Sequence, residues 1–126
     1  MTLVVDASAI AAVLFGEPEG LEMEAYLRDE TLIAPTLIDY ELANIGLKKV
    51  RRAPQRAAEI SGVLKGAKRL RIDRVAVPAD EAFALAARTG LSAYDASYLW
   101  VAIAKDAELV TLDKRLASVN EQLREQ

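Results

Sequence analysis

The sequence predicts an α/β protein, a three-layer sandwich in which helices cover both faces of a short parallel sheet of four to five strands. Short apolar runs, typical of buried parallel strands, alternate with longer segments of helical periodicity. Prolines and glycines mark many of the boundaries between these segments. Strands separated by helices form βαβ units, so the sheet is expected to be parallel. With 126 residues, the chain has room for one domain with a single core.

The first third of the chain contains two of the predicted strands. Leu3–Val5 is a short apolar run, and Ser8 is the predicted N-cap of a helix that ends at Gly16, a residue suited to the left-handed conformation. A second helix is expected over about residues 19–28, with acids in its first turn, and residues 32–34 form the next strand.

Prolines mark the starts of the next three predicted helices. Pro35 suits the first turn of a helix that runs to about residue 52, and Pro54 suits the start of one that runs to about residue 68. The third strand lies within residues 70–77. Pro78 then begins a helix that ends near Gly90.

The last third repeats the alternation once more. Ser92 can cap a helix over about residues 93–105, residues 109–111 form the fourth strand, and a final helix runs from about Asp113 to the end.

Composition excludes several classes of protein and of mechanism. The apolar fraction of 52% argues against disorder, and no apolar run approaches the roughly 18 residues that a membrane span needs. Acids interrupt the first apolar stretch, so no signal peptide is expected, and a cytoplasmic location is the default expectation. The chain contains no Cys and no His. This removes disulfides, histidine-based catalytic triads and histidine- or thiolate-bound zinc.

Two acids directly follow predicted strands. Asp6 comes after the first strand and Asp113 after the fourth. Parallel strands end at one edge of the sheet, where α/β proteins place their ligand crevice. Each acid has a simpler interpretation: Asp6 can be a turn residue, and Asp113 an N-cap.

Two further acids lie on helix faces that should be apolar. Glu41 lies four residues from both Leu37 and Ile45, and Asp95 is in line with Leu99. Glu41 can instead face solvent, and Asp95 can be a first-turn acid that the helix dipole favours. All four acids together predict a cluster at the carboxyl edge of the sheet.

A cluster of carboxylates requires a counter-charge unless the acids are protonated. Two like charges about 4 Å apart repel by about 4 kcal/mol at an effective dielectric constant of 20. Without His or Cys, the oxygen ligands select Mg²⁺ or Mn²⁺, and such a site suits phosphoryl chemistry with metal-activated water. One of the acids can serve as general base. Ser8 and Thr111 can orient the acids through hydrogen bonds.

Positive charge is concentrated in one segment. Residues 48–74 hold ten Lys and Arg against two acids, a balance of +8, and the rest of the chain carries −11, which gives the net charge of −3. The run just past Glu41 consists of Lys48, Lys49, Arg51 and Arg52. These side chains are candidates for contacts with a phosphate backbone. The alternative is a solvated helical hairpin or a contact with an acidic protein. No aromatic residues are interleaved here to form a base-stacking platform.

Four segments of the sequence resemble a known family. They are Val5-Asp6-Ala7-Ser8-Ala9, Tyr40-Glu41-Leu42-Ala43-Asn44, residues 91–102 (LSAYDASYLWVA) and residues 109–116 (LVTLDKRL). The motifs are similar, in order and spacing, to those of PIN-domain ribonucleases, and most of all to the VapC toxins of toxin–antitoxin pairs. The last two segments are the most specific, and the resemblance covers nearly the whole chain.

The resemblance implies a function and a site. The residues that would bind one or two metal ions are Asp6, Glu41, Asp95 and Asp113. The hydroxyls of Ser8 and Thr111 would orient these acids. The family implies an endoribonuclease dependent on Mg²⁺ or Mn²⁺, and a homodimer neutralised by a small antitoxin whose tail crosses the active-site groove. Many relatives carry another apolar strand after the last motif, whereas residues 117–126 here are polar and helical in pattern. This leaves the sheet's last strand open.

Other functions are weaker fits. Haloacid-dehalogenase-like phosphatases have a second Asp where this chain has Ser8, and receiver domains have an acid pair that is missing here. The stronger alternative is a catalytically inactive PIN-like module that binds a partner protein or RNA.

Overall fold

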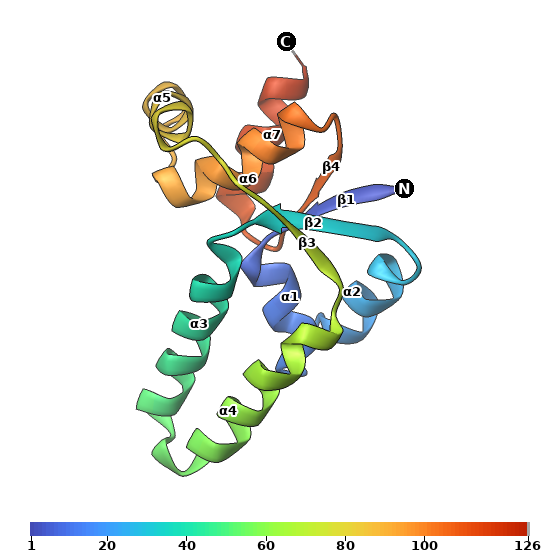
Figure 1. Ribbon diagram of the computed structural model, residues 1–126, viewed down its shortest axis with the longest axis vertical. Coiled ribbons are helices and arrows are strands. Elements are labelled where there is room, and N and C mark those ends of the chain that lie inside the picture. The colour runs from blue at the N-terminus through green and yellow to red at the C-terminus, as the bar shows by residue number, and fades with distance from the viewer. Residues whose placement is uncertain (126) are drawn as a thin grey trace.

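A four-stranded parallel sheet forms the middle layer of the computed structural model, which describes residues 1–125 (Figure 1). The strand order is β3-β2-β1-β4, so β1 is central and β3 and β4 are the edges. The strands are β1 (Thr2–Val5), β2 (Thr31–Pro35), β3 (Ile72–Val75) and β4 (Glu108–Val110). In register, Val4 lies opposite Ile33 on one side and Leu109 on the other.

Helices cover both faces of this sheet, which confirms the predicted three-layer α/β architecture (Figure 1). One layer holds α1 (Ala7–Leu14), α2 (Gly20–Leu27), α3 (Ile38–Arg52) and α4 (Ala57–Gly66), with short 3₁₀ helices η1 (Pro54–Arg56) and η2 (Ala67–Arg69) at the ends of α4. The other holds α5 (Ala79–Thr89), α6 (Ala93–Ala104) and α7 (Lys114–Arg124). No helix within the described residues combines the length and apolarity that a membrane crossing requires.

The core lies where β1 meets the helices on its two faces. Val4 and Val5 are fully buried, as a continuous apolar run on a central parallel strand predicts. Ile10 of α1 and Leu99 of α6 pack into the same core. Since this packing holds β1 from both sides, the residue that follows β1 has a well-defined position.

Two details differ from the sequence-based expectations. Pro35 ends β2 instead of beginning a helix, because it pairs with Val75 of β3 and α3 starts only at Ile38. Ser8 is not a helix cap. Asp6 is the N-cap of α1, and its carboxylate accepts a hydrogen bond from the backbone N–H of Ala9 at 3.0 Å.

The end of the described chain is helical, as its polar pattern predicts. Helix α7 follows β4, and residues 1–125 contain no fifth strand of the sheet.

Gly16 and Gly90 have φ angles of 62° and 79°, so each occupies the left-handed region that glycine tolerates best.

Candidate active site

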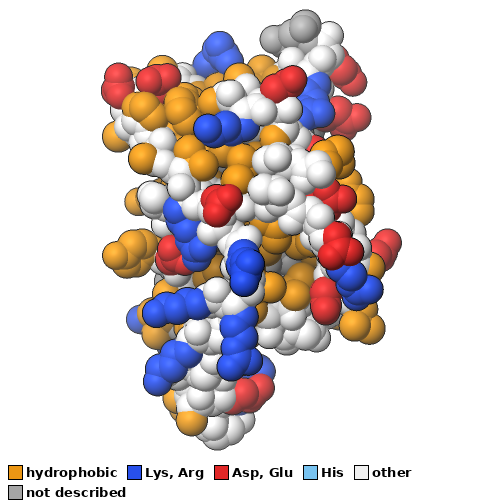
Figure 2. Space-filling view, turned by 45° about the vertical axis from the view of Figure 1, so that its right-hand side comes forward, with side chains coloured by type: hydrophobic (Ala, Val, Ile, Leu, Met, Phe, Trp, Pro, Cys, Tyr) orange, Lys and Arg blue, Asp and Glu red, His pale blue; other side chains and the backbone are white. Residues whose placement is uncertain are grey.

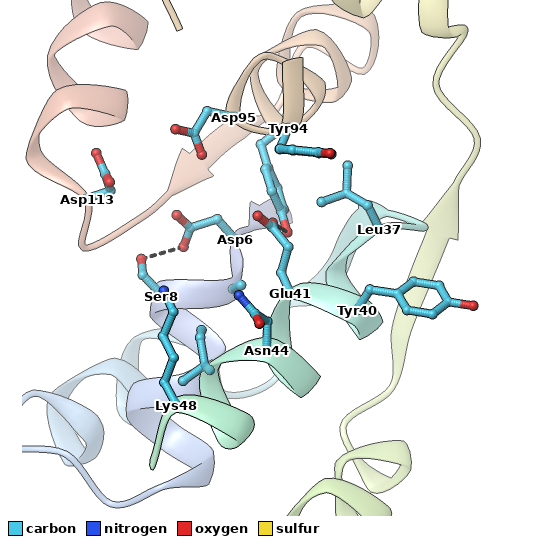
Figure 3. A pocket seen from close by; sticks show the side chains of 13 residues that line it. Asp6, Ser8, Leu37, Tyr40, Glu41, Asn44, Lys48, Tyr94, Asp95 and Asp113 are labelled. Atoms are coloured by element: carbon cyan, nitrogen blue, oxygen red, sulfur yellow. Dashed lines mark hydrogen bonds between the residues drawn. The ribbon is translucent and has the colours of Figure 1, made fainter. Parts of the chain in front are cut away.

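A pocket of about 510 Å³ lies at the carboxyl edge of the sheet, and all four predicted acids line it (Figure 3). Asp6 follows the central strand β1, and Asp113 follows the edge strand β4. Glu41 comes from the first turn of α3, and Asp95 from the first turn of α6. The four carboxylates therefore come from four separate elements: two follow strands that end at this edge, and two lie on the first turns of helices beside it.

Asp6 is the most enclosed of the four acids. It is 5% exposed, and its Oδ1 accepts hydrogen bonds from the Ser8 hydroxyl at 2.7 Å and from the Ala9 N–H. The hydroxyl of Thr111 donates to its Oδ2. Both predicted supporting hydroxyls thus bond the same carboxylate.

Ser8 and Thr111 also tie β1 to the segment after β4. The Leu112 N–H donates to Ser8 Oγ at 2.9 Å, and the Asp113 N–H donates to Thr111 Oγ1 at 2.9 Å. Asp113 in turn is the N-cap of α7 and accepts from the Leu116 N–H at 2.9 Å. Its capping role and its place in the pocket are compatible, because a cap needs only one of its two oxygens.

Glu41 is held by a buried tyrosine to which the sequence analysis gave no role. The hydroxyl of Tyr98, a residue only 1% exposed, donates to Glu41 Oε1 at 2.6 Å. Tyr98 belongs to α6, three residues after Asp95, so this bond connects the helices that carry two of the acids. Tyr98 lies in one of the segments that carry the family resemblance, but a tyrosine on a helix gives no separate signal of this contact.

Burial, together with the charge of neighbouring acids, raises the pKa of three of the acids, Asp6, Glu41 and Asp95. Burial raises the pKa of Asp6 above its ordinary value, and the charge of Asp113 adds to the rise, although hydrogen bonds from Thr111, Ala9 and Ser8 oppose it. Burial likewise raises the pKa of Glu41, opposed by Tyr98 and reinforced by Asp95 and Asp6. Burial and then Asp113 raise the pKa of Asp95. A cation in this pocket would offset the repulsion among the carboxylates and favour their charged forms.

The donor set suits a hard divalent cation. The carboxylate oxygens are the ligands that Mg²⁺ and Mn²⁺ prefer, and the described residues offer no softer donor at the pocket. No three acids within residues 1–125 lie close enough to coordinate one ion together as they stand. Mg²⁺ usually keeps several waters and binds through one or two carboxylates, so this spacing is compatible with its coordination.

The four basic candidates differ in their surroundings. Lys48 lines the pocket together with Asn44. Lys49 forms an ion pair with Glu17 at 3.1 Å and lies over the ring of Phe15. Arg51 and Arg52 are on the last turn of α3, away from the acids. Figure 2 shows Lys and Arg side chains gathered on the lower half of the molecule, where Figure 1 places α3 and α4.

Three tyrosines and an asparagine complete the pocket beyond the acids. Tyr40, Asn44, Tyr94 and Tyr98 all line it. All four belong to the motifs that carry the family resemblance, but the helical spacing of the sequence does not distinguish them from residues without a functional role.

Comparison with known proteins identifies the family of this chain. Residues 3–122 match the profile of the PIN domain. The chain belongs to the PIN-domain family. Its PIN domain is 38% identical over 122 residues to Ribonuclease VapC3 of Pyrobaculum aerophilum, covering 93% of each chain. It is 36% identical over 120 residues to Ribonuclease VapC9 of Mycobacterium tuberculosis, covering 94% of this chain and 91% of that one.

Solved structures show the same PIN fold. PAE2754 from Pyrobaculum aerophilum superposes over 100% of both chains with a TM-score of 0.74 and 27% sequence identity. VapC20 of Mycobacterium tuberculosis superposes over 92% of this chain and 93% of that one, with a TM-score of 0.65 and 18% identity, which is a likeness of fold. The family predicted from the four motifs is confirmed.

Proposed function

We propose that this PIN domain is a metal-dependent endoribonuclease, the toxin of a type II toxin–antitoxin pair, which hydrolyses RNA phosphodiester bonds. The observation that carries the proposal is the convergence of Asp6, Glu41, Asp95 and Asp113 from four elements on one pocket. Relatives named VapC ribonucleases, at 36–38% identity over more than nine-tenths of the chain, support it.

The four acids would hold Mg²⁺ or Mn²⁺. A bound ion of this kind lowers the pKa of water and stabilises charge on phosphate oxygens. Ser8 and Thr111 fix both oxygens of Asp6, so this carboxylate would enter the reaction in one orientation. Glu41 and Asp95 are the candidates for general base, because a raised pKa makes a carboxylate a better proton acceptor near neutral pH.

The family resemblance also implies two protein partners, a second copy of this chain and an antitoxin. We infer a homodimer in the cytoplasm, inhibited by a small antitoxin that covers the pocket. Mass measurement of the purified protein tests the dimer, and a small antitoxin-like protein encoded next to this one would support the pairing. A missing neighbour would weaken the toxin assignment more than the nuclease assignment.

Cleavage assays test the central claim. The purified protein is expected to cleave RNA with Mg²⁺ or Mn²⁺ and to stop when EDTA is added. Asp6→Asn and Asp95→Asn should abolish cleavage while circular dichroism shows a native fold. Undiminished cleavage by both folded variants would refute the assignment, and a wild-type protein that binds but never cleaves RNA would favour the inactive-module alternative.

A further inference from the structure

Two exposed tyrosines stand at the rim of the acidic pocket. Tyr40 is 82% exposed and Tyr94 is 66% exposed, yet both line the pocket beside Glu41 and Asp95. In Figure 3 they lie on the side of the pocket away from Asp113, with Leu37 near them. The third tyrosine of this pocket, Tyr98, is buried and bonded to Glu41, so it has a structural reason for its position.

Within the described residues, neither a hydrogen bond nor packing in the core accounts for the positions of the rings of Tyr40 and Tyr94. Within residues 1–125 neither hydroxyl forms a hydrogen bond, and neither residue belongs to the hydrophobic core. Each ring precedes a pocket acid by one residue, Tyr40 before Glu41 and Tyr94 before Asp95. They come from α3 and α6, so folding brings two exposed aromatic surfaces to the same rim.

We propose that Tyr40 and Tyr94 are base-stacking residues that hold unpaired nucleobases of single-stranded RNA beside the carboxylate pocket. This inference rests on the proposed ribonuclease function for its ligand. Aromatic side chains stack on nucleobases that are splayed out of a helix, and every base offers a π-face.

The charge of the site explains why stacking would be needed. The chain has a net charge of −3, and the pocket contains four acids against the single lysine Lys48. Phosphate contacts dominate the affinity of most nucleic-acid-binding proteins, but they are weak where the surface itself is negative. Stacking on two rings adds affinity that does not depend on positive charge.

Stacking would also select the form of the RNA. A base within a duplex cannot leave its partner without losing pairing and stacking energy, whereas an unpaired base can reach a ring at the rim. The platform should therefore favour single strands and loops over duplexes, with little preference among bases.

RNA binding by a non-cleaving protein tests the platform. In an Asp6→Asn background, fluorescence anisotropy would measure binding of a labelled single-stranded oligoribonucleotide and of its duplex. Tyr40→Ala and Tyr94→Ala should each weaken single-strand binding by about 5- to 100-fold, and Tyr→Phe at either position should stay within about twofold. Tyr26→Ala is the matched control, because Tyr26 is also exposed but bonds Glu108 at the opposite edge of the sheet.

Two further measurements separate stacking from other effects. On an oligoribonucleotide with abasic sites, the cost of Tyr→Ala should disappear, and on normal RNA the salt dependence of binding should not change, because no phosphate contact is lost. Unchanged affinity of both Tyr→Ala variants, or a loss that persists on abasic RNA, would overturn the proposal. So would a change of molecular mass that parallels the loss of RNA binding, since the rings would then contact a second copy.

Wild-type cleavage, measured separately, distinguishes this proposal from the function on which it rests. Tyrosine-dependent binding without metal-dependent cleavage would leave the platform standing and refute the nuclease. If single-stranded RNA is cleaved at the same rate by wild type and by both Tyr→Ala variants, the nuclease is supported and the stacking proposal is refuted.

Discussion

Asp6 is the N-cap of α1 and also one of the four acids in the pocket. Its place after the first strand was predictable, because an acid directly after a buried apolar run is visible in the sequence. That Asp6 and not Ser8 caps the helix was not predictable. The backbone N–H of Asp6 bonds the carbonyl of Val110, so contact with β4, more than a hundred residues away, decides where the helix begins.

Replacing Asp6 by Asn should abolish cleavage and stabilise the metal-free protein at neutral pH. The raised pKa means that the folded state binds the Asp6 proton more tightly than the unfolded chain, so stability falls as pH rises from about 4 through the raised native pKa. Asn is neutral at every pH. The melting temperature of Asp6→Asn should thus exceed that of wild type at pH 7.5, and the difference should vanish near pH 4.

Thermal melts in EDTA across pH 4–8 measure this effect, and about 3–5 °C corresponds to 1 kcal/mol for a domain of this size. Adding Mg²⁺ should raise the melting temperature of wild type more than that of the variant. A variant less stable than wild type at every pH would show that the lost hydrogen bonds outweigh the relief of the buried charge.

Tyr98→Phe should reduce cleavage without unfolding the protein. The change removes the hydroxyl that orients Glu41 and favours its charged form, so the pKa of Glu41 should rise further. A hydrogen bond to a charged group contributes about 1.5–3 kcal/mol, and we expect activity to fall about tenfold or more with the acidic limb of its pH profile moved upward. Tyr26→Phe, which removes a hydrogen bond to Glu108 at the other edge of the sheet, is the control. Equal loss in both variants would contradict a specific role for Tyr98.

The sequence did not predict the environments of three pocket tyrosines, Tyr40, Tyr94 and Tyr98. Each lies on a helix whose period is clear, but whether its ring is buried or exposed depends on how that helix packs. The acids were easier to predict, because a charge on an apolar face is anomalous whatever the packing. A tyrosine is compatible with either environment.

The order of helices and strands along the chain was predictable. Their boundaries and the order of the strands in the sheet were not. Short apolar runs and helical periodicity are local properties, and each predicted strand and helix is present. The β3-β2-β1-β4 order is a property of long-range pairing that no local pattern reveals. Pro35 illustrates the difference, since its preference for a helix start gives way to pairing with β3.

The junction of α1 and α2 depends on Gly20. A Cβ at this position would lie 2.3 Å from the backbone oxygen of Ala12, and a backbone atom cannot move aside cheaply. Gly20→Ala should therefore destabilise the protein by about 1–3 kcal/mol. Gly62→Ala is the matched comparison: it lies within α4 with no atom within 4 Å of the new Cβ, and should stabilise by about 0.5–1 kcal/mol. Urea titrations of both variants measure the two signs, and a neutral Gly20→Ala would show that α2 can shift.

Across the whole molecule, charge is divided between an acidic pocket and the basic segment 48–74. Part of this segment's charge is already neutralised, since Arg56 pairs with Glu59 and Arg74 with Asp39. Counting charges along the sequence could locate the basic segment, but only the fold shows which of its side chains are paired and which line the pocket.

Lys48 and Lys49 are neighbours that should behave differently. Lys48→Ala should weaken RNA binding and reduce the slope of log affinity against log salt by about 1, because Lys48 lines the pocket, where we propose that it contacts a phosphate. Lys49→Ala should leave that slope nearly unchanged, because Lys49 is paired with Glu17. Arg52→Ala combined with Lys48→Ala extends the series along α3. Identical slopes for wild type and all variants would assign the basic residues to a solvated surface.

The bonds that hold Asp6 between Ser8 and Thr111 have a consequence for the timing of synthesis. The central strand β1 is synthesised before the other three strands, but the carboxylate of Asp6 that follows it is oriented by Thr111, more than a hundred positions later, and Asp113 lies beyond that. A nascent chain with the first three acids exposed still lacks β4 and the fourth. If the pocket cleaves RNA as proposed, a nascent chain cannot cleave RNA until β4 and Asp113 have been synthesised and have folded against β1.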